Sequence, residues 1–79
     1  MAEQLDYLDA LALRVAKGDL DCVGALSRGE YLYVALAANS AELLNQSNDT
    51  IAEALARLGP EWTAALIERW QYKGNPARY

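Results

Sequence analysis

The chain of 79 residues has 11 acidic and seven basic side chains, one cysteine and no histidine. A chain of this length forms one domain and buries only about 60% of the surface that it exposes when unfolded. The lack of histidine excludes a Ser-His or Cys-His nucleophile, and the single cysteine excludes a cysteine-based zinc site and a disulfide within the chain.

Cysteine usage and hydropathy indicate the compartment. No apolar run approaches the roughly 18 residues that are needed to cross a bilayer. Acidic residues stand near the N-terminus, where a signal peptide carries positive charge. A lone cysteine also fits a reducing compartment. We therefore expect the chain to be the mature protein, cytoplasmic and without a membrane segment.

Charge is unevenly distributed along the chain. Residues 1–27 carry five acids and two bases, residues 28–58 carry four and two, and residues 59–79 carry two and three. Because affinity for nucleic acids comes mostly from neutralising phosphates, an acidic body argues against a general nucleic-acid binder. It is compatible with a partner whose surface is basic.

The first predicted helix extends over about residues 3–17. Its apolar residues recur at intervals of three and four, which places them on one helical face. They are Leu5, Leu8, Leu11, Ala12, Val15 and Ala16. Gly18 is expected to end the helix, since glycine adopts the left-handed conformation of a C-cap without strain.

Two shorter segments are less regular. A short helix is predicted over about 20–26 with Asp19 as its cap, although Gly24 weakens it. Further along, the sequence AELL favours another helical turn. The sequence NQSND that follows, at 45–49, is a cluster of turn formers and predicts a surface loop.

The most apolar helix is predicted over about 28–39. Ser27 and Glu30 have the spacing of a capping box, in which each side chain accepts a hydrogen bond from the other residue's backbone N–H. The segment is apolar almost all round, which is typical of the most buried helix of a bundle. Tyr31 and Tyr33 point to opposite sides of it, so at least one is expected to reach the surface.

The last two predicted helices span about 50–58 and 60–72. Thr50 and Glu53 repeat the capping-box spacing, and Gly59 is expected to end the first of the two helices. The proline after it suits the first turn of the second helix. That helix carries three large apolar residues at spacings of four, namely Trp62, Leu66 and Trp70.

Together these elements predict an all-α fold, a compact single-domain bundle of four to five short helices. We expect residues 1–74 to form the helical domain and residues 75–79 to be a short C-terminal tail. The 28–39 helix is expected at the centre, with the tryptophan-bearing helix packed across it.

The stretch from Asp19 to Glu30 resembles a calcium-binding EF-hand loop, with acids at positions 1 and 3, glycine at 6 and glutamate at 12. Val23 stands at position 5, where calcium needs an oxygen ligand. Ser27 and Glu30 are also what a helix start supplies. We therefore expect helix capping here and no metal or other cofactor, and keep a degenerate calcium site at 19–30 as a weaker alternative.

The C-terminal stretch ERWQYKGNPARY combines aromatic residues with positive charge, a combination enriched at binding hot spots. Both tryptophans are expected to be core residues of a protein that lacks phenylalanine. The candidate protein-binding residues are Arg69, Tyr72, Lys73, Arg78 and Tyr79, with Asp19 and Asp21 as an acidic patch.

The two helices that meet at Gly59 resemble a helix-turn-helix in outline. Such a motif reads DNA with polar and basic residues in the first turns of its second helix. Those turns here read PEWTAALIE, which is acidic and apolar. Recognition of DNA by this helix is therefore not expected.

These observations favour a small acidic, non-catalytic interaction module. We expect a regulator or inhibitor, such as an accessory protein of the phage or plasmid type, that covers a surface of a larger protein, with a homodimer as one arrangement. No nucleotide-binding motif is present, and the acids sit where helix caps and solvated faces need them. The alternative is a nucleic-acid-associated regulator that uses the aromatic and basic C-terminal end.

Overall fold

The structure, a computed structural model, describes residues 2–71 and is all-helical over this range. It consists of α1 (Ala2–Ala16), one 3₁₀ turn η1 (Asp21–Val23), α2 (Arg28–Ala37), α3 (Ala41–Ser47) and α4 (Ile51–Trp70). The molecule measures 34 × 28 × 25 Å. The predicted fold class, a compact all-α bundle, is confirmed.

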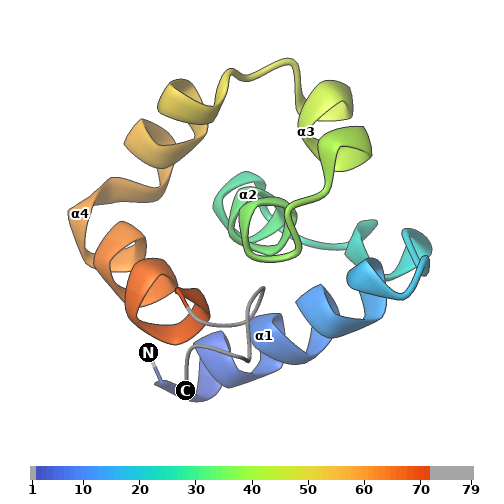
Figure 1. Cartoon of the computed structure of the whole chain (residues 1–79), viewed down its shortest axis with the longest axis horizontal. Helices are drawn as coiled ribbons and strands as arrows, with labels where there is room; N and C mark the ends of the chain where they lie inside the picture. Colours follow the sequence, from blue (N-terminus) through green and yellow to red (C-terminus); the bar gives the residue numbers. More distant parts are fainter. Residues whose placement is uncertain (1, 72–79) are drawn as a thin grey trace.

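Helix α2 lies at the centre of the bundle. Helices α1, α3 and α4 surround it when the molecule is viewed along its shortest axis (Figure 1), and each of them packs against it. Its residues 32–35 are all 0% exposed. Of the two tyrosines on this helix, Tyr33 is fully buried and Tyr31 is partly buried. The predicted central position of this helix is confirmed.

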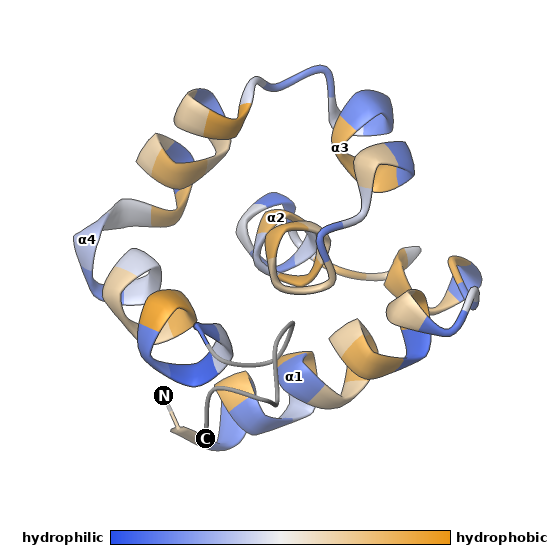
Figure 2. Cartoon of the chain, viewed as in Figure 1, coloured by the Kyte–Doolittle hydropathy of each residue, from blue (hydrophilic) through white to orange (hydrophobic). Residues whose placement is uncertain are grey.

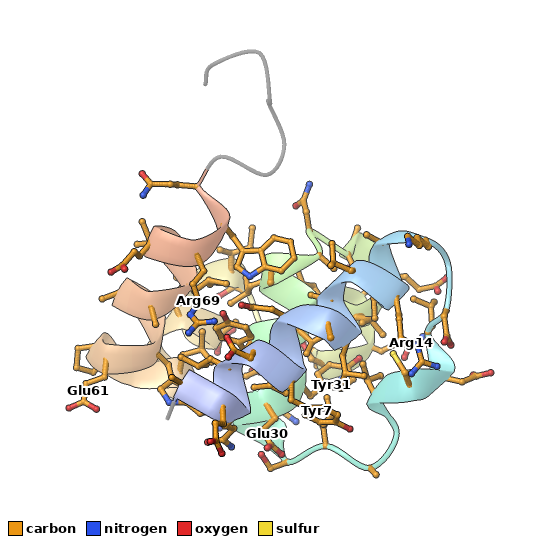
Figure 3. The ribbon with its side chains drawn as sticks, turned by 90° about the horizontal axis from the view of Figure 1, so that it is seen from below. Tyr7, Arg14, Glu30, Tyr31, Glu61 and Arg69 are labelled. Atoms are coloured by element: carbon orange, nitrogen blue, oxygen red, sulfur yellow. The ribbon has the colours of Figure 1, made fainter. Side chains whose placement is uncertain are left out.

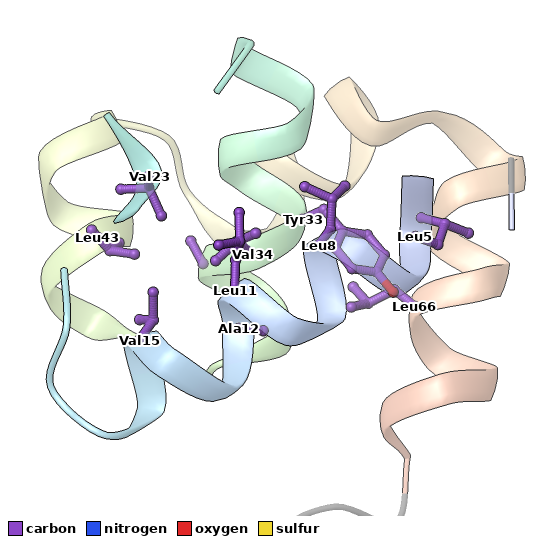
Figure 4. Packing of buried hydrophobic residues seen from close by; sticks show 11 residues of the cluster. Leu5, Leu8, Leu11, Ala12, Val15, Val23, Tyr33, Val34, Leu43 and Leu66 are labelled. Atoms are coloured by element: carbon purple, nitrogen blue, oxygen red, sulfur yellow. The ribbon is translucent and has the colours of Figure 1, made fainter. Parts of the chain in front are cut away.

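The core is formed where the surrounding helices turn their apolar faces to α2. For α3, Figure 2 shows a hydrophobic side toward α2 and a hydrophilic side away from it. Of the face predicted for α1, only Ala16 is exposed. Figure 4 shows Tyr33 reaching from α2 toward Leu66 of α4, beside Leu8 of α1. The buried core cluster comprises Leu5, Leu8, Leu11, Ala12, Val15, Val23, Tyr33, Val34, Ala35, Leu43 and Leu66.

Both predicted capping boxes are present. At the start of α2, the Ser27 N–H donates to Glu30 Oε1 (2.9 Å) and the Glu30 N–H donates to Ser27 Oγ (3.3 Å). At the start of α4, the Thr50 N–H donates to Glu53 Oε1 (2.9 Å) and the Glu53 N–H donates to Thr50 Oγ1 (3.0 Å). Each box satisfies two backbone donors that a helix start would leave without a partner.

Helices α1 and α2 end in the same way. After α1, Gly18 has φ = 106° and the N–H of Asp19 donates to the Arg14 carbonyl (3.0 Å), as predicted for a glycine C-cap. After α2, Asn39 has φ = 52° and the Ser40 N–H donates to the Ala35 carbonyl (2.9 Å). The helix predicted to reach residue 39 therefore stops at residue 37, because asparagine takes the left-handed position there.

The short helix predicted over 20–26 is wrong beyond a single 3₁₀ turn, Asp21–Val23. Three residues supply too few hydrogen bonds to propagate an α-helix, and Gly24 has a low helix propensity. The predicted cap is also wrong, because Leu20 is the N-cap residue, although Asp19 Oδ1 still accepts the N–H of Asp21 (3.2 Å). Val23 is buried and anchors the turn in the core.

The surface loop predicted for the sequence NQSND at 45–49 is also partly wrong. Its first three residues lie in α3, where Ser47 is buried and donates its hydroxyl to the Leu44 carbonyl (2.7 Å). Helix α3 is held on α2 by the buried Leu43, whose carbonyl accepts the Tyr31 hydroxyl (2.8 Å). This packing outweighs the turn propensity of the sequence.

Helix α4 contains a break at Gly59, where φ = 83° and ψ = 167° are not helical. The predicted boundary between the segments 50–58 and 60–72 is thus confirmed. The Thr63 hydroxyl crosses the break and donates to the Leu55 carbonyl (3.2 Å). The second segment is helical to Trp70, and its predicted last residue lies outside the described residues.

Two further predictions concern the ends of the chain and the membrane. The tail at 75–79 and the domain boundary at 74 lie outside the residues that the structure describes. Among residues 2–71, no helix combines the length and the apolar character that a bilayer crossing requires.

Gly59 provides a test of the break in α4. Its backbone conformation is essentially accessible to glycine alone, while nothing lies within 4 Å of the position that a Cβ would take. We expect Gly59→Ala to lower the free energy of unfolding by about 1–3 kcal/mol through backbone strain, as measured by urea denaturation. The control is Gly29→Ala, inside α2 and also without neighbours within 4 Å, which should be neutral or stabilise by about 0.5–1 kcal/mol. Equal effects of the two substitutions would contradict the strain at Gly59.

Candidate functional site

Three helices meet at the carboxylate of Asp9 in α1. Its Oδ1 accepts hydrogen bonds from Tyr33 Oη of α2 (2.7 Å) and from Trp70 Nε1 of α4 (2.7 Å). Its Oδ2 accepts a hydrogen bond from Arg69 Nη1 (2.8 Å), which also donates to Asp6 Oδ1 (2.9 Å). We call Asp9, Tyr33, Arg69 and Trp70 the Asp9 cluster.

The Asp9 cluster keeps its carboxylate ionised. Burial raises the pKa of Asp9, but hydrogen bonds from Trp70, Tyr33 and Arg69 and the charge of Arg69 outweigh it, so the pKa is below the ordinary value of 3.8. Burial, together with the hydrogen bond to Asp9, raises the pKa of the Tyr33 phenol. The protonation of both groups is thus fixed near neutral pH. This suits a structural clamp better than proton transfer, which needs a pKa near the working pH.

An apolar groove lies next to the Asp9 cluster, where the C-terminal ends of α1, α2 and α4 come together. Its volume is about 590 Å³, within the range of pockets that hold small ligands or a few side chains. Trp70 belongs to both features, since its indole N–H bonds to Asp9 and its side chain lines the groove. The lining residues are Leu13, Ala16, Leu36, Ala37, Ala38, Asn39, Leu66, Ile67, Trp70 and Gln71.

Two large apolar side chains are exposed along this groove. Leu13 of α1 is 47% exposed and Ile67 of α4 is 57% exposed, whereas Leu66 is buried. Scattered apolar residues on a surface are ordinary. Exposed ones that line a common groove can bury their apolar area together against one ligand or partner. Tyr7 and Ile51 are equally exposed and do not line the groove. The groove is therefore the best candidate binding site among the described residues.

Arg69, one of the predicted binding residues, is held against α1. Its side chain is 28% exposed and forms ion pairs with Asp6 and Asp9. The positive charge that was expected to face a partner is thus paired with two carboxylates of α1. The structure gives Arg69 a clear part in joining α4 to α1.

Asp19 and Asp21, the predicted acidic patch, lie just after α1. Asp19 Oδ2 accepts hydrogen bonds from Arg14 Nε (3.0 Å) and Nη2 (2.6 Å), so its charge is balanced locally. Asp21 is exposed. In Figure 3, Arg14 and Arg69 lie at different ends of α1. Among the described residues, Arg69 is therefore separated along α1 from Asp19, which pairs with Arg14.

The carboxylate of Glu30, position 12 of the EF-hand-like stretch, has both oxygens engaged. Oε1 accepts the Ser27 N–H, and Oε2 accepts Gln4 Nε2 (2.9 Å). The backbone hydrogen bond from Ser27 and the one from Gln4 lower the pKa of Glu30. Within residues 2–71, no group of three or more His, Cys, Asp or Glu side chains is placed to hold a metal ion. The capping role assigned to Glu30 is confirmed.

The remaining predicted residues, Tyr72, Lys73, Arg78 and Tyr79, lie outside the described residues. Both tryptophans pack against the core while remaining partly exposed. Trp62 meets the buried ring of Tyr33 edge-on, with ring centroids 5.8 Å apart and an interplanar angle of 81°. Their predicted core position is thus confirmed in part.

Sequence reasoning missed Leu13 and Ile67. Leu13 is absent from the apolar face predicted for the first helix, and Ile67 lies beside the tryptophan stripe rather than in it. Apolar residues off the stripe of an amphipathic helix were the available signal. Both side chains border one groove because of how α1 and α4 are placed around α2. The spacing of residues within either helix does not specify this placement.

Comparisons with known proteins do not assign a family. No protein-family model matches the chain, and searches of curated proteins and of solved structures also find no match.

The Asp9 cluster can be tested by unfolding experiments. Asp9→Ala removes the acceptor of three hydrogen bonds and leaves the hydroxyl of the fully buried Tyr33 without its acceptor. We expect a loss of about 2–3 kcal/mol in the free energy of unfolding. Asp6→Ala is the matched control, since Asp6 bonds to the same arginine but is 72% exposed, and it should cost less than about 1 kcal/mol. Similar losses for both variants would show that Asp9 has no special role.

The lowered pKa of Asp9 also predicts how stability depends on pH. The pKa of Asp9 is lower in the folded state than in the unfolded chain, where it has its ordinary value of 3.8. Its ionised carboxylate therefore stabilises the fold fully above pH 3.8. This stabilisation is lost as the pH falls through the lower, folded-state pKa. We therefore expect the free energy of unfolding to fall less for Asp9→Asn than for the original protein as the pH is lowered from 5 to strongly acidic values. Urea unfolding at a series of pH values measures this difference. Glu30 and Asp49, whose pKa values are also lowered, should leave the variant with a residual acid sensitivity. Identical pH profiles would rule out a lowered pKa at Asp9.

Proposed function

We propose that this protein is a non-catalytic interaction module, a regulator or inhibitor that covers a basic and apolar surface of a larger protein. The observation that carries the proposal is the apolar groove bordered by the exposed Leu13 and Ile67. Burying such side chains against a partner is favourable by about 25 cal/mol per Å² of apolar surface removed from water. The groove thus supplies an attractive contact for an aromatic or aliphatic side chain.

Charge defines the chemistry of the partner. All 11 acids but only five of the seven bases lie within residues 2–71, so this part of the chain has a formal charge of −6. Glu61 and Glu68 are exposed on the same half of α4 as Ile67, and no ion pair neutralises them within the described residues. Figure 3 shows Glu61 pointing away from the body of the protein. A segment with lysine or arginine beside an apolar side chain fits this surface.

A non-catalytic role is supported by the state of the polar groups. The sequence lacks histidine, the usual acid or base near neutral pH. The carboxylate of Asp9 has both oxygens engaged, and its pKa is lowered away from neutrality. Arg69, which the nucleic-acid alternative would use, is already paired with two carboxylates. These observations favour a protein partner over a substrate or a nucleic acid.

The test is affinity capture with variants of the groove. The immobilised full chain should retain a discrete protein from an extract of its own cells, and Leu13→Asp combined with Ile67→Asp should lose it. Ile51→Asp is the matched control: Ile51 is 61% exposed but lies outside the groove, so this variant should retain the protein. Because opposite charges are screened by salt, retention should also weaken as ionic strength rises.

Three outcomes of the capture experiment would overturn the proposal. They are equal retention by the groove variant and the Ile51 variant, retention of nucleic acid in place of protein, and retention of nothing but a second copy of this chain. The thermal stability of both variants should match that of the original protein, because the substituted side chains are exposed.

A further inference from the structure

The second half of α4, residues 60–70, forms one wall of the apolar groove. Leu66, Ile67 and Trp70 line the groove from this segment, and Gln71 follows them. The other lining residues come from the C-terminal ends of α1 and α2 and from residues 38–39. The groove therefore exists only while residues 60–70 lie against the other two helices. We call this segment the wall helix.

The wall helix is joined to the first half of α4 at a residue that can act as a hinge. Gly59 has φ = 83° and ψ = 167°, which are not helical, and its Cα faces open space. Pro60 has no backbone N–H, so it cannot donate a hydrogen bond to the first half of the helix. Hinges are a few residues at the ends of elements that absorb a change in backbone angles. The wall helix can therefore turn as a unit about Gly59.

The far end of the wall helix is held on α1 by polar contacts. Arg69 Nη1 donates to Asp9 Oδ2 (2.8 Å), and Trp70 Nε1 donates to Asp9 Oδ1 (2.7 Å). Apolar burial contributes less, because only Leu66 is buried between residues 60 and 70, whereas α1 buries five side chains. Segments with few buried apolar side chains open at a lower free energy than the whole domain. The two hydrogen bonds to Asp9 thus act as a latch.

We propose that the wall helix turns about Gly59 between a closed position, in which the latch at Asp9 is formed, and an open position without latch or groove. Asp9 is then a positioning residue, since it does not line the groove but fixes Trp70, which does. An apolar side chain bound between Leu13 and Ile67 contacts both walls and favours the closed position, so its apparent affinity falls with the closed fraction. This regulation rests on the proposed function, whereas the opening itself does not.

The experiment is native-state hydrogen exchange, followed by NMR on the full chain without a partner and in urea too dilute to unfold it. The backbone N–H groups of residues 32–35, which are all 0% exposed, report global unfolding. Those of residues 66–70 should exchange at least about tenfold faster, because they are released by opening of the wall helix alone. Their exchange should also depend less on urea, since a partial opening exposes less surface.

Two substitutions separate the opening from global unfolding. Figure 4 shows Val23 and Leu66 on opposite sides of the core. Because Val23 stays packed when the wall helix opens, Val23→Ala should speed exchange at residues 32–35 by about tenfold and leave residues 66–70 unchanged. Asp9→Asn weakens the latch, which is absent from both the open and the unfolded states, so it should speed exchange in both groups by about tenfold.

Asp6→Asn is the matched control for Asp9→Asn. Asp6 accepts from the same arginine but is 72% exposed, so this variant should change exchange in either group by less than about fivefold. Three results would overturn the proposal: exchange of both groups at one rate in the original protein, equal acceleration of both by Val23→Ala, or no acceleration at residues 66–70 in Asp9→Asn. Because no partner is used, a failed capture experiment does not affect this result.

Discussion

The carboxylate of Asp9 is the constraint on which the arrangement of the helices depends. It lies on α1, and its three donors come from α2 and α4, so one side chain fixes the relative position of three helices. One of those donors, the Tyr33 hydroxyl, belongs to a side chain that is 0% exposed, and leaving it without an acceptor in the interior would be costly. The acid that looks like one of many on an acidic protein is therefore a structural residue.

The groove is a consequence of the same arrangement. Trp70 donates a hydrogen bond to Asp9, so the last turn of α4 lies against the middle of α1, while α2 ends at residue 37. The groove between these helices is lined by three alanines, whose small side chains fill little volume, and by larger apolar side chains that include Leu13 and Ile67. A small domain buries a limited fraction of its surface, so an unfilled apolar site of this kind is available for a partner.

The proposed function depends on this one surface. Acids on α4 and apolar side chains along the groove favour a basic and aromatic segment of another protein. Such a domain needs no catalytic group, since the charge pattern and the groove alone define what it covers.

By itself, the sequence determined the local structure. Capping boxes at Ser27 and Thr50, the C-cap at Gly18 and the break at Gly59 depend on residues within a few positions of one another, so their patterns predict where helices begin and end. Helical periodicity likewise predicted the core face of α1, and an apolar surface almost all round predicted the central place of α2. The predicted helical turn at AELL lies in α3, and the sequence was wrong only about residues 45–47, because the burial of Leu43 and its hydrogen bond with Tyr31 outweigh the turn propensity of NQSND.

Only the tertiary structure decided the roles of residues that meet across the chain. Arg69 was predicted to face a partner, yet it pairs with Asp6 and Asp9, which lie 63 and 60 positions earlier in the sequence. Leu13 and Ile67 gain significance only from sharing a groove. A periodic pattern specifies which face of a helix is apolar, but it does not specify which helices lie side by side or at what depth. Those contacts depend on how side chains from distant segments fit together, and this is settled when the whole chain packs.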